Sequence, residues 1–328
     1  MGSVRGNETN LSLRKKERCS RDLSTRHDMK YLTIGHASYD ITFRVDSFPI
    51  ENTKKRVGKH IDCGGGPASN AGYLLSLWGC DVSFQGVVGN DYYGRKIKEE
   101  FNSVGVDTNF LELIDSMDTN LSYIIANTTN TSRTILTSQD DFIARCSILN
   151  DNKYDVILVD GEEEEMSKRV LLNNKDAVKI IDAGTCKPST VNLCPLVDYL
   201  VCSKNFALDY TKLPYDGELE NLIKIHEKLV NDFHNTVVIT LEDKGCFTKI
   251  GNEYKLIPSI KVKAVDTTGA GDIFHGAFTY FITHDYTLED TCRLANITGA
   301  LSTLKVGGRY SIPSLNSVLE RSGEVDII

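Results

Sequence analysis

Short apolar runs alternate with amphipathic segments along the chain from residue 30 onward. The runs are rich in β-branched residues, as strands that are buried on both faces usually are. We expect strands at 31–35, 82–88, 154–160, 178–182, 197–202 and 236–241, and helices at 67–78, 91–103, 162–174, 216–234, 270–283, 287–304 and 314–321. Because strands and helices alternate, the pattern predicts an α/β fold in which helices cover both faces of a mostly parallel sheet.

Two regions, residues 41–62 and 110–137, break this alternation. The runs Ile41–Val45, Leu121–Ile125 and Arg133–Leu136 alternate apolar and polar positions without a helix between them. That pattern is typical of a small antiparallel sheet with one open face. We expect this sheet to project from the α/β body as a lid over a ligand site.

The two ends of the chain differ from the body. Residues 1–28 carry many Lys and Arg residues but few large apolar ones, so we expect a disordered N-terminal extension. They lack the apolar core of a signal peptide. We expect one domain at 29–322 and a C-terminal tail at 323–328. The sequence has no run of about 18 apolar residues, so it predicts no membrane span.

Composition and charge narrow the class of protein. The chain has 328 residues, of which 41% are hydrophobic and 25% charged, which is typical of a globular enzyme and not of a disordered or fibrous chain. The formal net charge is −8, so nucleic acid and acidic membranes are not expected as partners. The nine cysteines are scattered and form no C-x-x-C pair, which indicates free thiols in a cytoplasmic protein.

The segment Asp266-Thr-Thr-Gly-Ala-Gly-Asp272 carries the strongest chemical signal, between an extended stretch and an apolar helix. The small residues Gly269, Ala270 and Gly271 allow the backbone to approach a ligand, and a helix start offers free N–H groups to an anion. Asp272, which we expect to be ionised near neutral pH, could accept a hydroxyl proton beside that anion. This pairing suits phosphoryl transfer to an alcohol. A Gly-rich helix start with a capping aspartate is the alternative.

A second motif, Gly64-Gly-Gly-Pro-Ala-Ser-Asn70, opens the helix expected at 67–78. Gly65 and Gly66 let the main chain pass close to a ligand, and the Asn70 amide offers two donors and an acceptor. The spacing fails the dinucleotide-binding fingerprint at its third position. A tight turn with a capping asparagine is the alternative interpretation.

Together, the two motifs resemble the two signatures of the ribokinase-like (PfkB) carbohydrate kinases, most closely the fructokinase-, ketohexokinase- and sulfofructose kinase-like members. The resemblance runs from about residue 30 to residue 322. It implies a Rossmann-like ribokinase fold with a β-sheet lid, and ATP-dependent phosphorylation of a hydroxymethyl group with Mg²⁺. Under this resemblance, Asp272 is the catalytic base, and Gly269, Ala270 and Gly271 form the anion hole.

The resemblance also assigns residues to the acceptor sugar. Asp40 matches the carboxylate that binds sugar hydroxyl groups, and Gly65, Gly66 and Asn70 match the sugar-binding turn. Arg133 opens a lid strand, as an arginine often does in this family. A cation in that position could also bind an anionic substituent of the sugar.

The nucleotide side matches the family less closely. Thr240 and Gly245 fit the strand end Thr-x-Gly-x-x-Gly, but Glu242 replaces the first glycine. Thr268 and Asn296 are also assigned to the nucleotide, with Asn296 beside the adenine.

The resemblance leaves the metal ligands open. The stretch Ser203-Lys-Asn-Phe206 lacks the glutamate of the family's Asn-x-x-Glu, so phosphates and water could hold Mg²⁺. Asp266, Thr268 and Ser311 match positions near the potassium loop of several members, which makes them candidates for a K⁺ site.

The preferred hypothesis is an ATP-dependent sugar kinase whose acceptor is a ketose such as fructose or a derivative. An adenosine-like nucleoside kinase of the same fold stays open, because Tyr39, Phe43 and Tyr123 could surround a base. A non-catalytic, sugar-binding regulatory protein is the third hypothesis. The expected partners are sugar and ATP, together with a second copy of the chain bound through the lid.

Overall fold

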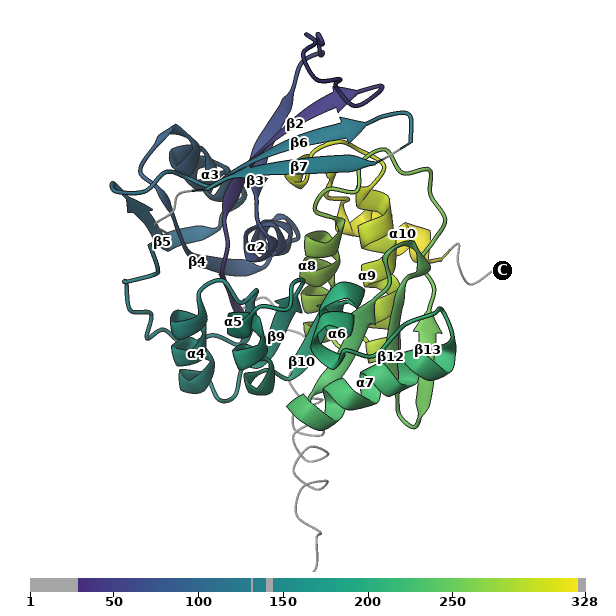
Figure 1. Ribbon diagram of the computed structural model, residues 1–328. Helices are drawn as coiled ribbons and strands as arrows, with labels where there is room; N and C mark the ends of the chain where they lie inside the picture. The colour runs from purple at the N-terminus through teal and green to yellow at the C-terminus, as the bar shows by residue number, and fades with distance from the viewer. Residues whose placement is uncertain (1–28, 131, 140–143, 324–328) are drawn as a thin grey trace, which may run out of the picture.

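The computed structural model describes residues 29–130, 132–139 and 144–323, and arranges them as two sheets with surrounding helices (Figure 1). The extension expected at 1–28 lies outside the described residues, as do residues 324–328 of the expected tail. Across the described segments, no helix is both long enough and apolar enough to cross a membrane.

The larger sheet has the strand order β13-β12-β11-β10-β9-β8-β1-β4-β5. Its strands are β1 (Lys30–Ile34), β4 (Asp81–Gly89), β5 (Asp107–Ile114), β8 (Val156–Val159), β9 (Val178–Ala183), β10 (Tyr199–Ser203), β11 (Thr236–Thr240), β12 (Cys246–Ile250) and β13 (Glu253–Ile257). The strands from β5 to β11 pair in parallel, whereas β12 and β13 add an antiparallel edge. The expected mostly parallel sheet is therefore confirmed.

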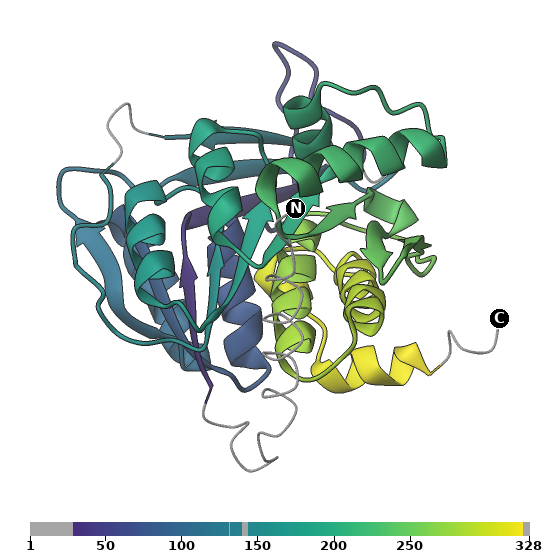
Figure 2. The same cartoon turned by 90° about the horizontal axis from the view of Figure 1, so that it is seen from below.

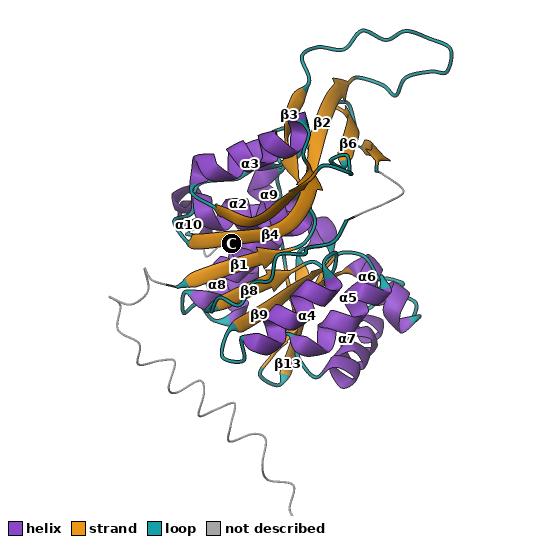
Figure 3. Cartoon of the chain, turned by 90° about the vertical axis from the view of Figure 1, so that its left-hand side faces the viewer, coloured by secondary structure: helices purple, strands orange, loops and turns teal. Residues whose placement is uncertain are grey.

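Helices cover both faces of this sheet, as Figure 3 shows. They are α2 (Pro67–Leu77), α3 (Tyr92–Val104), α4 (Glu164–Asn173), α5 (Pro188–Leu193), α6 (Lys204–Thr211), α7 (Leu219–Phe233), α8 (Ala270–Thr283), α9 (Leu288–Ser302) and α10 (Leu315–Ser322). A hydrophobic core lies on each face of the sheet, and strand β8 contributes to both. Val156 and Leu158 pack with α2 and α8 on one face, while Ile157 and Val159 pack with α4 and α7 on the other. This alternation explains why the strand is apolar throughout.

The smaller sheet has the order β3-β2-β6-β7 and lies across the upper end of the molecule in Figure 1. Its strands are β2 (Ser38–Val45), β3 (Ile61–Gly65), β6 (Leu121–Asn127) and β7 (Arg133–Ser138). The sheet was expected to be antiparallel, but β2 and β6 pair in parallel, so it is mixed.

Strand β5 also differs from the expectation. Residues 110–114 fell within the range expected for the lid, yet they belong to β5, which pairs in parallel with β4 at the edge of the larger sheet. The physical reason is its position: an edge strand is only partly covered, so its polar and apolar positions mix as they do in an open sheet. The helix α3 between β4 and β5 makes this pair a crossover unit of the larger sheet.

Strand β1 is the point at which the order of strands along the larger sheet reverses, although the strands on both sides of it run in the same direction. The chain proceeds from β1 through β4 to β5 on one side, and then from β8 through β11 on the other. In open α/β sheets, ligands bind at such a switch point, outside the carboxyl ends of the strands. Helix α8 packs between α2 and α9 (Figure 2).

Replacing Phe281 with Ala tests the core around α8. Its fully buried ring packs edge-on against Trp78 and Tyr286. The cavity left behind should lower the free energy of unfolding by about 3–5 kcal/mol. Chemical denaturation measures this change, with the exposed Leu172→Ala as the matched control. Equal losses in both variants would contradict the assigned core.

Candidate active site

Gly269 is the N-cap of helix α8, and its φ of 73° lies in the left-handed region that favours glycine. Gly271 is exposed, and a Cβ placed there would meet no atom within 4 Å. The first turn of α8 therefore presents bare backbone to the space in front of it, although the Ala270 N–H also donates to the Thr267 carbonyl at 3.3 Å. Asp272 lies in this same turn.

The two sequence motifs meet at a side-chain hydrogen bond. The Asn70 amide Nδ2 donates to Asp272 Oδ2 at 2.8 Å. Asn70 is buried in the first turns of α2, and a Cβ on Gly269 would also lie 3.6 Å from its amide. The structure thus brings Asp272, Gly269 and Asn70 together.

Burial is the main cause that raises the pKa of Asp272 to about 7, and the Asp182 carboxylate adds to the rise. The Asn70 amide and His275 oppose it, while Asp40 raises the pKa further. We expected this carboxyl to be ionised near neutral pH. Instead it titrates there, as a general base that works at neutral pH does.

Asp40 lies buried in β2 and accepts a hydrogen bond from Ser38 Oγ at 3.2 Å. Burial raises the pKa of Asp40. The turn predicted to bind the sugar passes beside Asp40, because a Cβ on Gly65 would collide with the Asp40 carboxyl group. Gly66 directly precedes α2 and has a φ of 97°. It lies so close to His36 that a Cβ on Gly66 would collide with the His36 carbonyl oxygen. Both glycines are therefore required sterically.

Arg309 is a buried cation beneath this turn, which the sequence did not reveal as part of the site. Its guanidinium donates to Glu100 Oε2 at 2.7 Å and to the Ser69 hydroxyl, and its Nε lies 3.4 Å from Asn70 Oδ1. It also stacks over the ring of Phe101, with 4.6 Å between the guanidinium carbon and the ring centroid. Arg309 thus anchors the amide that binds Asp272.

The smaller sheet contacts the segment that precedes α8 through Arg133. This residue begins β7, and its guanidinium donates to the Thr267 hydroxyl, two residues before Gly269. The lid strand and the start of α8 are therefore in direct contact. The role of Arg133 in binding the acceptor stays a prediction.

On the predicted nucleotide side, the substitution at Glu242 comes with an ion pair. Glu242 adopts a left-handed φ of 58°, a conformation that glycine adopts most readily. Its carboxylate accepts a hydrogen bond from Lys204 Nζ at 3.1 Å. Thr240 ends β11, and the φ of Gly245 is 98°.

Asn296 is buried in α9, where its amide Nδ2 donates to the Ile257 carbonyl at 2.9 Å. The same group lies 3.5 Å from the Cys246 sulfur. These bonds tie α9 to the hairpin of β12 and β13. A place beside the adenine stays a prediction.

Asp266 and Thr268 form a tight, buried turn. Asp266 Oδ1 accepts from the backbone N–H of Thr268 at 2.9 Å and from its hydroxyl at 2.7 Å, while Oδ2 accepts from Gly307 N–H at 3.1 Å. Ser311 lies in the adjoining 307–311 turn, where its hydroxyl donates to the Gly308 carbonyl. The structure therefore brings Asp266, Thr268 and Ser311 close together. These contacts are hydrogen bonds within the protein, and a K⁺ site at this turn stays a prediction.

No group of three or more His, Cys, Asp or Glu side chains in the described residues is placed to hold a metal ion. Where the sequence lacks the family's glutamate, Ser203 caps α6 and Lys204 pairs with Glu242. These residues do not form a protein cage for Mg²⁺. An ion held mainly by phosphates and water suits the coordination chemistry of magnesium.

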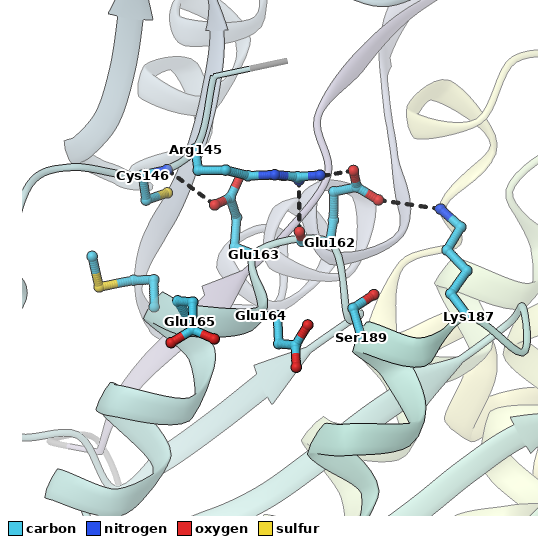
Figure 4. A pocket seen from close by; sticks show the side chains of 9 residues that line it. Arg145, Cys146, Glu162, Glu163, Glu164, Glu165, Lys187 and Ser189 are labelled. Atoms are coloured by element: carbon cyan, nitrogen blue, oxygen red, sulfur yellow. Dashed lines mark hydrogen bonds and ion pairs between the residues drawn. The ribbon is translucent and has the colours of Figure 1, made fainter. Parts of the chain in front are cut away.

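A separate cavity of about 300 Å³ lies at the start of α4 (Figure 4). Glu164 and Glu165 occupy the first turn of α4, where negative charge interacts favourably with the helix dipole. Glu162 pairs with Arg145 at 2.9 Å and with Lys187 at 3.3 Å. Ion pairs inside the cavity thus already compensate part of its negative charge.

Two further carboxylates near the site lie at strand ends, Asp160 after β8 and Asp182 in β9. Asp160 accepts from the backbone N–H groups of His36, Ala68 and Glu162 at 2.8–3.1 Å. Neither residue was selected as a site residue from the sequence, although an aspartate at or near the end of a buried apolar strand is a signal that could have found both. That signal does not say which other segment each residue meets.

Replacing Arg309 with Met should lower the free energy of unfolding by about 3 kcal/mol, because Glu100 loses its partner in a largely buried place. Urea unfolding at neutral pH measures the loss. The double variant Arg309→Met/Glu100→Gln should regain part of it. The matched control is Arg44→Met on the exposed face of β2. A loss no larger than that of the control would contradict the role of Arg309.

Comparison with known proteins points to one family. A family model described as pfkB family carbohydrate kinase matches residues 29–315. The ribokinase of Lactococcus lactis subsp. lactis is 27% identical over 320 residues, which cover 91% of this chain and 98% of the relative. An ATP-dependent ribose-1-phosphate kinase of Halopiger xanaduensis is 25% identical, and the match covers 88% of this chain and 97% of that protein.

Solved structures show the same fold. Arabidopsis thaliana ribokinase complexed with ribose and ATP has a TM-score of 0.76 and 21% identity, and the match covers 89% of this chain and 98% of that chain. Thermotoga maritima ribokinase has a TM-score of 0.71 and 24% identity, with coverages of 90% and 99%. The two motifs, the two sheets and the family match agree. The chain therefore belongs to the pfkB family of carbohydrate kinases, phosphotransferases that act on a sugar hydroxyl group.

Proposed function

We propose that this chain is an ATP-dependent sugar kinase that phosphorylates a hydroxymethyl group, with Asp272 as the general base. The observation that carries the proposal is the first turn of α8. There a carboxyl group with a pKa of about 7 lies beside open backbone and is bonded to Asn70 of the sugar turn. An acid–base group next to an anion site is what transfer of a phosphoryl group to an alcohol requires.

The chemistry follows from this arrangement. Asp272 accepts the proton of the acceptor hydroxyl as that oxygen attacks the terminal phosphorus of ATP. The backbone N–H groups of Gly269, Ala270 and Gly271 stabilise the charge on the transferring group. Asp40, Gly65, Gly66 and Asn70 hold the sugar. Magnesium bound to the nucleotide would neutralise phosphate charge.

The acceptor in this proposal is a small monosaccharide. The motifs favour a ketose such as fructose or a derivative. The names of the relatives instead favour ribose, as in Lactococcus lactis ribokinase, or a phosphorylated ribose, as in the Halopiger xanaduensis kinase. We keep both in the test, because each of these sugars offers hydroxyl groups that Asp40 and Asn70 could bind.

The nucleotide and ion sites complete the proposal. ATP binds near Thr240, Gly245, Thr268 and Asn296, at the carboxyl end of the parallel strands. A K⁺ ion near the Asp266 turn would order the loop that precedes α8. The eight cysteines in the described residues are free, as suits a cytoplasmic enzyme.

A homodimer formed through the lid is also part of the proposal. All six residues of β7 are exposed, including the apolar Ile135 and Leu136. Because β7 is the last strand of the smaller sheet, its outer edge offers unpaired backbone groups.

The deciding experiment measures ADP release from Mg–ATP with a panel of acceptors. It includes fructose, tagatose, ribose, deoxyribose, ribose 1-phosphate, sulfofructose, adenosine and inosine. We expect turnover of one sugar and a loss of at least about 10³-fold in kcat for Asp272→Asn, which cannot accept the proton. Asp81→Asn, at the far end of β4, is the matched control. Activity on nucleosides alone would favour the nucleoside kinase, and retained activity in Asp272→Asn would refute the assigned base.

The pH profile tests the same residue independently. Because burial raises the pKa of Asp272 to about 7, the carboxyl is protonated and inactive below that pH. We expect kcat/KM for the sugar to rise with pH and to reach half its plateau near pH 7. Initial rates across the acid and neutral range provide the measurement. An acid limb near pH 4, the ordinary carboxyl value, would contradict the perturbed site.

A further inference from the structure

His275, in the second turn of α8, has an oxygen acceptor at each ring nitrogen. Its Nδ1 lies 2.7 Å from the Gly271 carbonyl oxygen, and its Nε2 lies 3.1 Å from the Val201 carbonyl oxygen. A carbonyl oxygen accepts hydrogen bonds but cannot donate one. A neutral imidazole carries only one N–H, so one nitrogen would then point a lone pair at an oxygen. Both contacts are satisfied only when both nitrogens carry a proton.

Asp182 supplies the matching negative charge. Its Oδ2 lies 3.2 Å from His275 Nδ1, and the two side chains are only 5% and 4% exposed. Burial disfavours the charge of each partner taken alone, so it raises the pKa of Asp182 and lowers that of His275. As an ion pair, the charges cancel over a short distance, and the ring N–H groups keep their carbonyl acceptors. We therefore favour the charged pair.

The charges around this pair explain why a cation is needed. Four side chains face the carboxyl group of Asp272. They are Asp182 of β9, Asp40 of β2, the Asn70 amide of α2, and His275 of the same helix α8. Asp182 in turn faces Asp160 at the end of β8. Two carboxyl groups, those of Asp182 and Asp40, thus act on the place where the base must lose its proton, and Asp160 lies behind Asp182. A like charge at short range makes that loss harder.

We propose that His275 is a positioning residue that stays doubly protonated, balances the charge of Asp182, and so allows Asp272 to ionise at neutral pH. The inference rests on the proposed role of Asp272 as the base. His275 acts through Asp182 and the field at the carboxyl group of Asp272, and touches neither sugar nor nucleotide in this account. The reaction itself is unchanged, and the pair sets the pH range in which it runs.

Nitrogen-15 NMR of the full chain with labelled histidine tests the protonation state without any substrate. The loss of one signal in His275→Asn assigns the residue among the seven histidines. We expect both ring nitrogens of His275 to be protonated at pH 7 and above, and one of them to lose its proton in Asp182→Asn. A neutral ring at pH 7 in the unmodified chain would overturn the proposal, whatever the fate of the variants.

The pH dependence of kcat tests the consequence. His275→Asn keeps a neutral donor near the position of Nδ1 but removes the charge, so the acid limb should move up by about one pH unit. Such a shift should lower kcat by about tenfold at pH 6, in addition to any loss that the variant shows at pH 9. The double variant Asp182→Asn/His275→Asn removes both charges and should return the limb toward its original position. A purely structural role would lower kcat equally at every pH.

Asp272→Asn separates this inference from the proposed function. If Asp272→Asn stays active, the assigned base is wrong and the function needs revision. If Asp272→Asn is inactive but the acid limb of His275→Asn does not move, the base is right and the role of His275 is refuted. The sugar used is the one that the acceptor panel gives with the highest kcat/KM.

Discussion

The hydrogen bond between Asn70 and Asp272 joins the two halves of the site, and the other elements hold its two partners in place. The bond depends on the close approach of α2 and α8. Gly276 permits that approach, because a Cβ at this position would lie 3.1 Å from the Cα of Ala71. Arg309 fixes the amide from below, and Gly269 allows α8 to begin where it does. The base therefore owes its position to helix packing.

The site concentrates negative charge and compensates it in several ways. Asp160 is bonded to three backbone N–H groups, and Asp266 to two backbone N–H groups and a hydroxyl. Arg309 pairs with Glu100, and His275 with Asp182. Asp272 has one amide donor and remains partly open to the space in front of α8. Partial compensation and partial exposure together are consistent with a base that titrates near neutral pH.

The departures from the family pattern are related to one another in space. Glu242 replaces a glycine, and Lys204 lies in the stretch that lacks the metal-binding glutamate. The structure pairs these two residues across the ends of β10 and β11. Glu242 adopts a left-handed backbone, which is the conformation that glycine adopts most readily.

The sequence by itself determined the repeating strand–helix pattern, the parallel sheet and the family. These follow from local periodicity, from turn chemistry, and from two motifs that need only their own neighbours. Only the tertiary structure decided that β5 joins the larger sheet and that β2 pairs in parallel with β6. It also placed Asp182 beside His275, and Arg309 beneath the sugar turn. Such contacts join residues far apart in the chain, and local patterns do not specify which distant segments pack together.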